Sequence, residues 1–155
     1  MKGTGMRALG VNVIVILALA LGVSAAVAAT HSSARATTVS TARTGLGRVI
    51  VDSRGRTLYL FEKDKRGHSA CSGVCAAYWP PLLTSAKPLA KAGAKQSLLG
   101  TIRRSDGRKQ VTFAGHPVYL FSGDTNRGQT NGEGLTDFGA SWYAVSPSGK
   151  KIDQD

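Results

Sequence analysis

The chain contains none of the short motifs that mark common catalytic or phosphate-binding sites. No G-x-S-x-G, H-E-x-x-H or phosphate-cradling glycine loop occurs in its 155 residues. The glycine-rich stretch 123–134 holds Asp124, Asn126 and Glu133, but it lacks the residue order and glutamate spacing of a calcium-binding loop. The C-x-x-C-H signature of haem attachment is also absent. We therefore expect a protein that is not an enzyme and that carries no cofactor.

Charge is absent from a long apolar run near the N-terminus. Lys2 and Arg7 precede the uncharged residues 8–29, which end in the small residues S-A-A-V-A-A with an A-x-A-type cleavage site. This order predicts an export signal over residues 1–29 and a secreted or extracytoplasmic bacterial protein of the cell envelope. An uncleaved membrane anchor is the alternative, because the run could span a bilayer, which takes roughly 20 residues. Membrane contact is expected only through such an anchor, since no later segment is apolar enough.

Aromatic residues are absent from the next segment, residues 30–45, which is rich in Ser, Thr and Ala. Such a composition cannot bury enough apolar surface to offset the entropy that is lost on ordering. We therefore expect a flexible tether here, followed by one domain over residues 46–155. Within the domain, a first repeat is expected over residues 46–83 and a second over residues 98–152.

Acidic residues are scarce. Asp and Glu number 9 against 20 Lys and Arg, which gives a formal net charge of +11 at pH 7. A surface of this sign attracts polyanions. For an exported chain these are anionic cell-wall or membrane-surface polymers, and nucleic acid is not an expected partner. A basic surface that serves only solubility is the interpretation that the sequence favours over specific anion binding, because Lys and Arg are spread along the chain and form no dense block.

Cysteine occurs only twice, at Cys71 and Cys75. An even count in an exported chain favours a structural disulfide. A redox-active pair is an alternative, although the C-x-x-x-C spacing differs from C-x-x-C and no βαβ pattern surrounds it. A copper site is another alternative, in which two thiolates act with His68 or His116, although methionine, another soft ligand, occurs only near the N-terminus. Otherwise the two histidines are expected to lie at the surface or in turns.

The domain is expected to be mainly β. Hairpins are predicted over residues 48–62 and 101–113, because β-branched and aromatic runs flank turn residues in both. A further turn and strand follow in residues 114–124, and a strand, a turn and a short strand follow in residues 141–152. One short helical or irregular segment, residues 69–79, carries both cysteines and ends before two prolines.

One motif occurs twice along the chain. G-R-T-L-Y-L-F-E-K-D, residues 55–64, matches G-H-P-V-Y-L-F-S-G-D, residues 115–124, and a tryptophan follows each copy. We interpret this as a duplication in which two small β units share one core, since neither could bury its apolar face alone. The repeated positions are Gly55, Tyr59, Phe61, Asp64 and Trp79 in the first copy and Gly115, Tyr119, Phe121, Asp124 and Trp142 in the second.

Strand alternation assigns the side chains of the motif to faces. Tyr59 and Phe61 share one face of their strand and leucines occupy the other, so the strand should be covered on both sides. Asp64 and Asp124 fall at strand exits, where a carboxylate can accept hydrogen bonds from backbone N–H groups of the following loop. The alternative is a functional pair of carboxylates, either in a hydrolase of wall polymers or in a cation site.

These motifs carry a resemblance to a known family. The order Y-L-F-x-x-D, C-S-G-x-C-x-x-x-W-P-P, G-H-P-x-Y-x-F-x-x-D and W-Y resembles the bacterial secreted-repeat proteins of unknown function, often described as predicted lipoproteins with a repeated Y-x-[FWY]-x-x-D motif. The resemblance covers nearly all of residues 46–151 and implies an extracytoplasmic, repeated, β-rich domain without an established activity. Lipid attachment is not implied, because no cysteine stands at the end of the apolar run.

The sequence thus predicts an exported, small antiparallel β domain of two related hairpin repeats with one short cysteine-containing segment. Its expected role is that of a non-catalytic binding or structural component of the cell envelope. The alternative role is an accessory protein for redox chemistry or copper handling that uses the C-x-x-x-C pair.

Overall fold

The computed structural model describes residue 3 and residues 36–154. Apart from Gly3, the expected export signal lies outside the described residues, as do the first residues of the expected tether. Within the described part of the chain, no helix is long and apolar enough to span a membrane. The elements are β1 (Thr38–Thr44), β2 (Gly47–Asp52), β3 (Tyr59–Phe61), α1 (Val74–Tyr78), β4 (Leu89–Ala90), the 3-10 helix Gln96–Leu98, β5 (Leu99–Arg103), β6 (Lys109–Phe113), β7 (His116–Pro117), β8 (Thr136–Asp137) and β9 (Ala140–Ala144).

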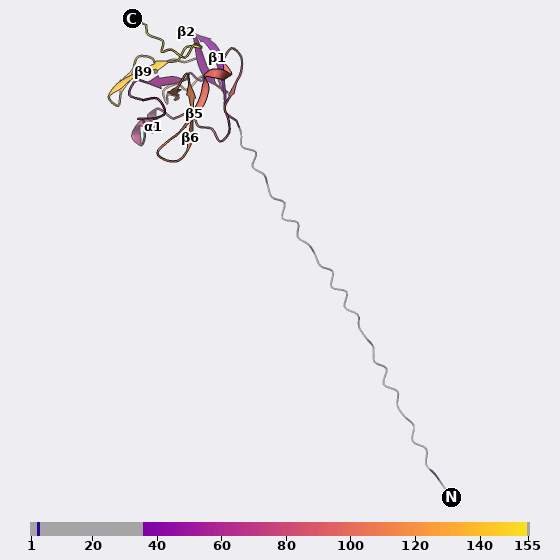
Figure 1. The fold of residues 1–155 in the computed structure, drawn as a ribbon. Coiled ribbons are helices and arrows are strands. Elements are labelled where there is room, and N and C mark those ends of the chain that lie inside the picture. The colour runs from indigo at the N-terminus through magenta and orange to yellow at the C-terminus, as the bar shows by residue number, and fades with distance from the viewer. Residues whose placement is uncertain (1–2, 4–35, 155) are drawn as a thin grey trace. The chain divides into compact units, whose positions relative to one another are not determined.

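The strands form three small sheets in the orders β2-β1-β4, β3-β9-β8 and β5-β6-β7. Their pairings are antiparallel except for the two-residue parallel pairing of β1 with β4. Figure 1 shows β1 and β2 on one side of the domain and β9 and α1 on the other. The predicted mainly β domain is therefore confirmed, together with a short helical segment that contains the second cysteine.

The expected tether needs a correction in its second half, because Thr38–Thr44 forms β1. This strand pairs antiparallel with β2 from Val39 opposite Asp52 to Thr44 opposite Gly47. Only Val39 of β1 is fully buried. The composition of residues 30–45 is poor in large apolar groups, but a strand of a hairpin needs few of them. Its partner supplies the ladder of backbone hydrogen bonds, and one side chain reaches the core.

The two copies of the motif meet at the centre of the domain as an antiparallel pair. The backbone N–H of Tyr59 donates to the carbonyl of Tyr119 at 2.9 Å, and the reverse hydrogen bond is also 2.9 Å. The chain after each tryptophan crosses to the other copy, so Ala144 pairs with Tyr59 and Pro81 pairs with Tyr119. The two repeats are thus interlocked about a pseudo-twofold axis and do not form two separate lobes.

The core has two layers on opposite faces of these central strands. One layer is aliphatic and contains Leu58 and Leu60, as strand alternation predicts. The other contains Tyr59 and Phe61 with both tryptophans and both cysteines. Each buried aromatic removes on the order of 150–250 Å² from water, so the second layer supplies much of the apolar burial of this small domain.

Candidate functional site

Four rings of the repeated motif form one continuous stack in the aromatic layer. Trp79 and Trp142 stack on each other at 3.9 Å between ring centroids, with planes 4° apart. Phe61 of the first repeat stacks on Trp142 of the second at 4.0 Å, and Phe121 of the second packs on Trp79 of the first at 4.4 Å. Each phenylalanine therefore contacts the tryptophan of the other repeat, and the stack joins the two halves.

The tyrosine and aspartate of the motif also pair across the two repeats. The Tyr59 hydroxyl donates to Oδ2 of Asp124 at 2.6 Å, and the Tyr119 hydroxyl donates to Oδ2 of Asp64 at 2.7 Å. Burial is the main cause that raises the pKa of both tyrosines, and the facing carboxylates raise these pKa values further. Both hydroxyls therefore stay protonated and serve as hydrogen-bond donors.

The second oxygen of each carboxylate binds the loop that follows it. Oδ1 of Asp64 accepts the backbone N–H of Ala70 at 2.7 Å, and Oδ1 of Asp124 accepts that of Asn131 at 2.9 Å. Every oxygen of the two carboxylates thus has a donor. Each aspartate ties its own loop to the tyrosine of the other repeat, so the two carboxylates sit in separate caps.

The predicted disulfide between Cys71 and Cys75 is confirmed. The first cysteine is fully buried and the second is 6% exposed, against the aromatic layer that includes Trp79. The disulfide closes the turn that leads into α1 (Val74–Tyr78). In this state the two sulfurs are bonded to each other, so neither is a thiolate that could ligate copper or attack another disulfide.

Arg104, a buried cation that the sequence analysis did not single out, holds the cysteine loop. Its guanidinium donates to the carbonyl of Cys71 at 2.6 Å, to Oε1 of Gln110 at 2.6 Å and to Oγ of Ser69 at 2.9 Å. The Ser69 hydroxyl in turn lies 2.7 Å from the Tyr119 hydroxyl. No local pattern in T-I-R-R-S-D-G predicts this burial, because Ser69 and Cys71 are distant in sequence.

The two histidines of the domain are exposed and lie in different environments. His68 exchanges backbone hydrogen bonds with Lys65 in the loop after the first motif. His116 begins β7, and partial burial, with the nearby Arg66, lowers its pKa. Within residues 36–154, no three His, Cys, Asp or Glu side chains are grouped so that they could hold a metal ion.

One cleft, of about 790 Å³, brings Asp64 and His116 together over an apolar floor of Leu60 and Phe61. Its rim carries Lys151, which forms ion pairs with Glu62 and Asp153. The carboxylate of the second repeat does not line this cleft. The predicted acidic residues are therefore not brought together as a pair across one opening.

Asp64 gives a prediction for the pH dependence of stability. Its burial raises the pKa above the ordinary 3.8, against hydrogen bonds from Ala70 and Tyr119 that lower it. At pH values just above 3.8, Asp64 is therefore protonated in more of the folded molecules than of the unfolded ones. For this reason its contribution to the free energy of unfolding decreases as pH rises. Asp64→Asn removes this decrease. We expect it to destabilise more at about pH 4 than at about pH 6, measured by urea denaturation.

The control for this experiment is Asp137→Asn, which changes an exposed carboxylate in β8. Its effect should be small at both pH values. If the stability gap between wild type and Asp64→Asn instead widens as pH rises, the burial effect on Asp64 is not what governs it.

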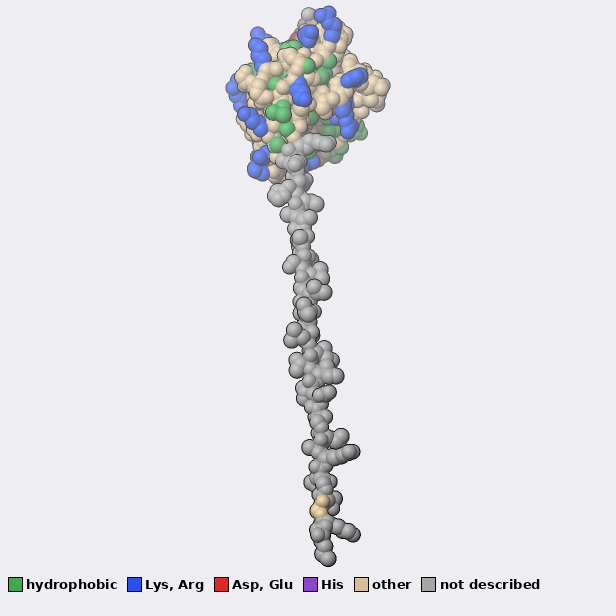
Figure 2. Space-filling view, turned by 90° about the vertical axis from the view of Figure 1, so that its right-hand side faces the viewer, with side chains coloured by type: hydrophobic (Ala, Val, Ile, Leu, Met, Phe, Trp, Pro, Cys, Tyr) green, Lys and Arg blue, Asp and Glu red, His purple; other side chains and the backbone are tan. Residues whose placement is uncertain are grey.

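The domain has more cations than carboxylates, and most of its carboxylates already have hydrogen-bond or ion-pair partners within the domain. The acceptors of hydrogen bonds or ion pairs are Asp52, Glu62, Asp64, Asp106, Asp124, Glu133 and Asp153. Many cations, by contrast, make no side-chain hydrogen bond or ion pair within the described residues: Arg43, Arg54, Lys65, Arg66, Lys87, Lys91, Lys95, Lys109, Arg127 and Lys150. Figure 2, which views the side where β1 lies in Figure 1, shows Lys and Arg across this face and very little acidic surface.

An arginine–glycine pair follows the aspartate in each repeat, a signal that the sequence analysis missed. The Arg127 side chain lies against Gly55 of the other repeat, where an added Cβ would be 3.1 Å from its Nε. Arg66 likewise approaches Gly115, at 3.9 Å from an added Cβ. Both glycines have positive φ, 79° and 84°. The glycine of the motif therefore forms a turn, and its lack of a side chain leaves room for an arginine of the other repeat.

The comparisons with known proteins agree with this duplicated architecture. A family model described as a secreted repeat of unknown function matches residues 40–83 and 100–146. The first match begins inside β1, and each match contains one copy of the motif with its tryptophan. No curated protein and no solved structure matches the chain.

Proposed function

The chain belongs to the family of secreted repeats of unknown function, and from this premise we propose that it is a non-catalytic component of the bacterial cell envelope that binds anionic polymers. The observation that carries the proposal is the imbalance of surface charge. Seven carboxylates have a hydrogen-bond donor or a cation as a partner in the domain, whereas cations such as Arg43, Lys91 and Arg127 make no side-chain hydrogen bond or ion pair within the described residues. Free cations on a domain outside the cytoplasm attract polyanions of the envelope.

The engagement of the two motif aspartates supports a non-catalytic role. A glycosidase needs two carboxyl groups that face one opening, roughly 5 to 9.5 Å apart. Here Asp64 lines a cleft that Asp124 does not line. Both oxygens of each carboxylate already accept hydrogen bonds from a tyrosine and a loop N–H. These contacts hold loops in place, and they leave neither carboxylate with a free oxygen for proton transfer to a substrate.

Retention on envelope material tests the proposal. The native exported protein is passed over protein-free cell-wall material at low ionic strength and eluted with a salt gradient. We expect retention at about 20 mM salt and release by about 0.5 M, because salt screens exposed charges over a few ångströms at that concentration. The control is the same material with its acidic groups chemically neutralised, which should retain none of the protein. Absence of retention by untreated material at low salt would rule out the proposal.

A further inference from the structure

Four large apolar side chains are exposed within the described residues, and three of them gather at one place. Val74 and Tyr78, which are 68% and 56% exposed, lie one turn apart on the same face of α1. Phe138, which is 40% exposed, lies between β8 and β9, and its ring centroid is 6.2 Å from that of Tyr78. Single exposed apolar residues are common on protein surfaces, but a group of them indicates a site of protein or membrane contact. We call Val74, Tyr78 and Phe138 the apolar patch.

Phe138 occupies a backbone position that disfavours a bulky residue. It forms a two-residue hairpin turn with Gly139, because Asp137 pairs with Ala140. Both turn residues have positive φ, 57° and 90°. Turns of this kind favour Asn, Asp or Gly at the first position, since the backbone there crowds a larger side chain. A phenylalanine at this position is kept at a cost in stability, which indicates a role outside folding.

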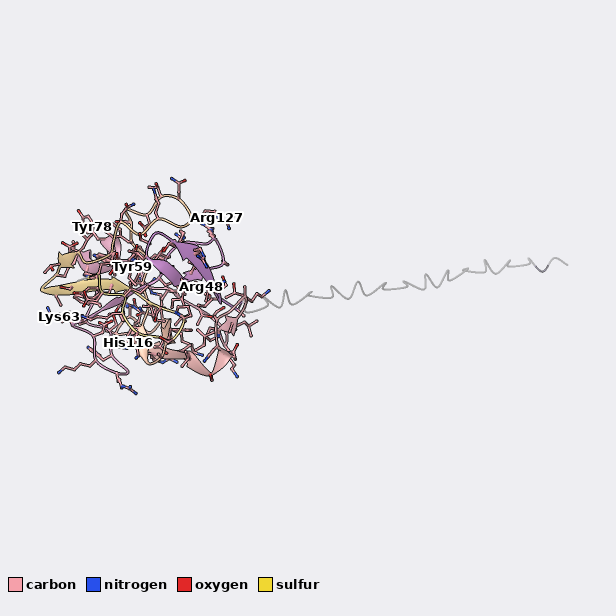
Figure 3. All side chains as sticks on the ribbon, turned by 90° about the horizontal axis from the view of Figure 1, so that it is seen from above. Arg48, Tyr59, Lys63, Tyr78, His116 and Arg127 are labelled. Atoms are coloured by element: carbon pink, nitrogen blue, oxygen red, sulfur yellow. A yellow bond between two sulfur atoms is a disulfide. The ribbon has the colours of Figure 1, made fainter. Side chains whose placement is uncertain are left out.

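The apolar patch is held in place by contacts beneath it. The disulfide closes the turn that leads into α1. Nε1 of Trp142 donates to the carbonyl of Asp137 at 3.2 Å, and Nζ of Lys63 donates to that of Phe138, also at 3.2 Å. Figure 3 shows Tyr78 and Lys63 toward the same end of the domain. The patch is therefore in a fixed arrangement before a partner binds, which lowers the entropy lost on binding.

The shape of the apolar patch favours a partner that needs no pocket. None of its three side chains lines the clefts of about 790, 370 or 260 Å³ between the described residues. A stable protein–protein interface buries about 800 Å² on each partner, of which three partly exposed side chains supply only a small part. A lipid bilayer needs no matching shape, since apolar side chains bind by entering the boundary between head groups and acyl chains.

The chemistry around the apolar patch fits a bilayer that contains anionic lipids. Tyrosine is enriched at membrane–water interfaces, because its ring is apolar and its hydroxyl can stay in water. Lys63 places a cation beside Phe138, and the formal net charge of the chain is +11. Basic groups close to a bilayer are attracted to anionic head groups. The exposed carboxylate of Asp137 opposes this attraction.

We propose that the apolar patch docks the domain on the surface of an anionic lipid bilayer, with Tyr78 and Phe138 inserted between the head groups. The sequence predicts membrane contact only through an N-terminal anchor, because no later segment forms a long apolar run. The patch is instead assembled from two segments that are distant in the sequence. The inference goes beyond the proposed function, because exposed apolar side chains carry it and free cations do not.

The test measures cosedimentation of the native exported protein with vesicles. One set of vesicles contains phosphatidylglycerol and phosphatidylcholine in equal parts, and the other contains phosphatidylcholine alone. We expect the protein to bind the mixed vesicles more tightly. Phe138→Asn should weaken this binding on the order of tenfold, because moving a phenylalanine side chain out of water is worth about that factor or more.

The stability of Phe138→Asn separates a binding role from a structural one. Asparagine suits the positive φ of this turn, so the variant should have a urea midpoint equal to that of the wild type or higher. Weaker vesicle binding without a loss of stability is the expected combination. A phenylalanine that serves only the fold would give the reverse combination, a lower urea midpoint with vesicle binding unchanged.

The strand β4 supplies matched controls on the side of the domain opposite α1. Leu89 is 44% exposed there, so Leu89→Asn makes the same kind of change and should leave vesicle binding unaltered. Lys63→Gln should weaken binding to the mixed vesicles about fivefold, whereas Lys91→Gln, just after β4, should not. Asp137→Asn should strengthen it. Thermal unfolding of each variant checks that the domain is folded.

The outcomes decide between a bilayer and other partners. The inference is wrong if the mixed vesicles do not bind the protein, if both vesicle types bind it equally, or if the two asparagine variants weaken binding equally. It is also wrong if Phe138→Asn abolishes self-association in sedimentation velocity and leaves vesicle binding unchanged, because the partner is then a second copy. Salt-sensitive retention on wall material without vesicle binding overturns the inference and leaves the proposed function standing. Absence of that retention removes the proposed function, whatever the vesicles show.

Discussion

Replacing either Trp79 or Trp142 by alanine is expected to lower the free energy of unfolding by about 3–5 kcal/mol, the usual cost of truncating a large buried aromatic. Both side chains are fully buried, and each stacks on the other and on a phenylalanine of the opposite repeat. The cavity that either substitution would leave lies where the two halves of the core meet. Since small domains are stable by only about 5–15 kcal/mol, we expect a large fraction of each variant to be unfolded at room temperature in mild urea.

The corresponding phenylalanine variants sharpen the test, because the two indoles differ in their hydrogen bonding. Nε1 of Trp142 donates to the carbonyl of Asp137 at 3.2 Å, whereas Nε1 of Trp79 is buried without a partner in the described residues. Trp142→Phe should therefore cost more than Trp79→Phe, by about 1 kcal/mol. Urea denaturation followed by circular dichroism measures both. If the alanine variants have the same urea midpoint as the wild type, the stability of the core does not depend on the stack.

Asp124→Ala is the second substitution with a large expected effect, a loss of about 2–5 kcal/mol. It removes the acceptor of the Tyr59 hydroxyl and that of the Asn131 N–H at the same time. The ring of Tyr59 is fully buried and Asp124 is 7% exposed, so water replaces the lost acceptor poorly. The unsatisfied hydroxyl is the main cost.

A double-mutant cycle isolates that cost. Tyr59→Phe removes the hydroxyl, so Asp124→Ala should be less destabilising in the Tyr59→Phe background than in the wild type. Asp64→Ala is the matched control in the other repeat. It should cost less, because Asp64 is more exposed and the Tyr119 hydroxyl keeps Ser69 as a partner. Equal losses at the two aspartates, with no coupling to Tyr59, would show that the cross-repeat pairs do not stabilise the domain.

Local physical rules explain how much of the fold could be predicted. The alternation of T-L-Y-L-F assigned leucines and aromatics to opposite faces, and two core layers lie on those faces. Turn residues between β-branched runs predicted a hairpin over residues 48–62, in which the N–H of Leu58 donates to the carbonyl of Ile50, but they gave no sign of β1. The hairpin of β5 (Leu99–Arg103) and β6 (Lys109–Phe113) was predicted well, because both of its strands carry the local signal.

β1 was missed because its stability does not come from its own composition. Thr38–Thr44 contains one fully buried apolar residue, Val39, and obtains its order from pairing with β2 and from the parallel contact with β4. Amino-acid composition indicates how much apolar surface a segment can bury by itself. It says nothing about the backbone hydrogen bonds that a neighbouring strand supplies, so composition alone places this segment in the tether.

By itself the sequence determined the class of the domain, its duplication and the faces of its central strands, because these follow from periodicities that act within a few residues. Tertiary structure alone decided that Tyr59 pairs with Asp124 and not with Asp64, that Arg104 is buried under the cysteine loop and that Arg127 rests on Gly55. Each of these contacts joins residues from distant segments. The physical reason is that the repeats exchange strands after their tryptophans, and this crossing, which no local pattern encodes, brings these distant partners into contact.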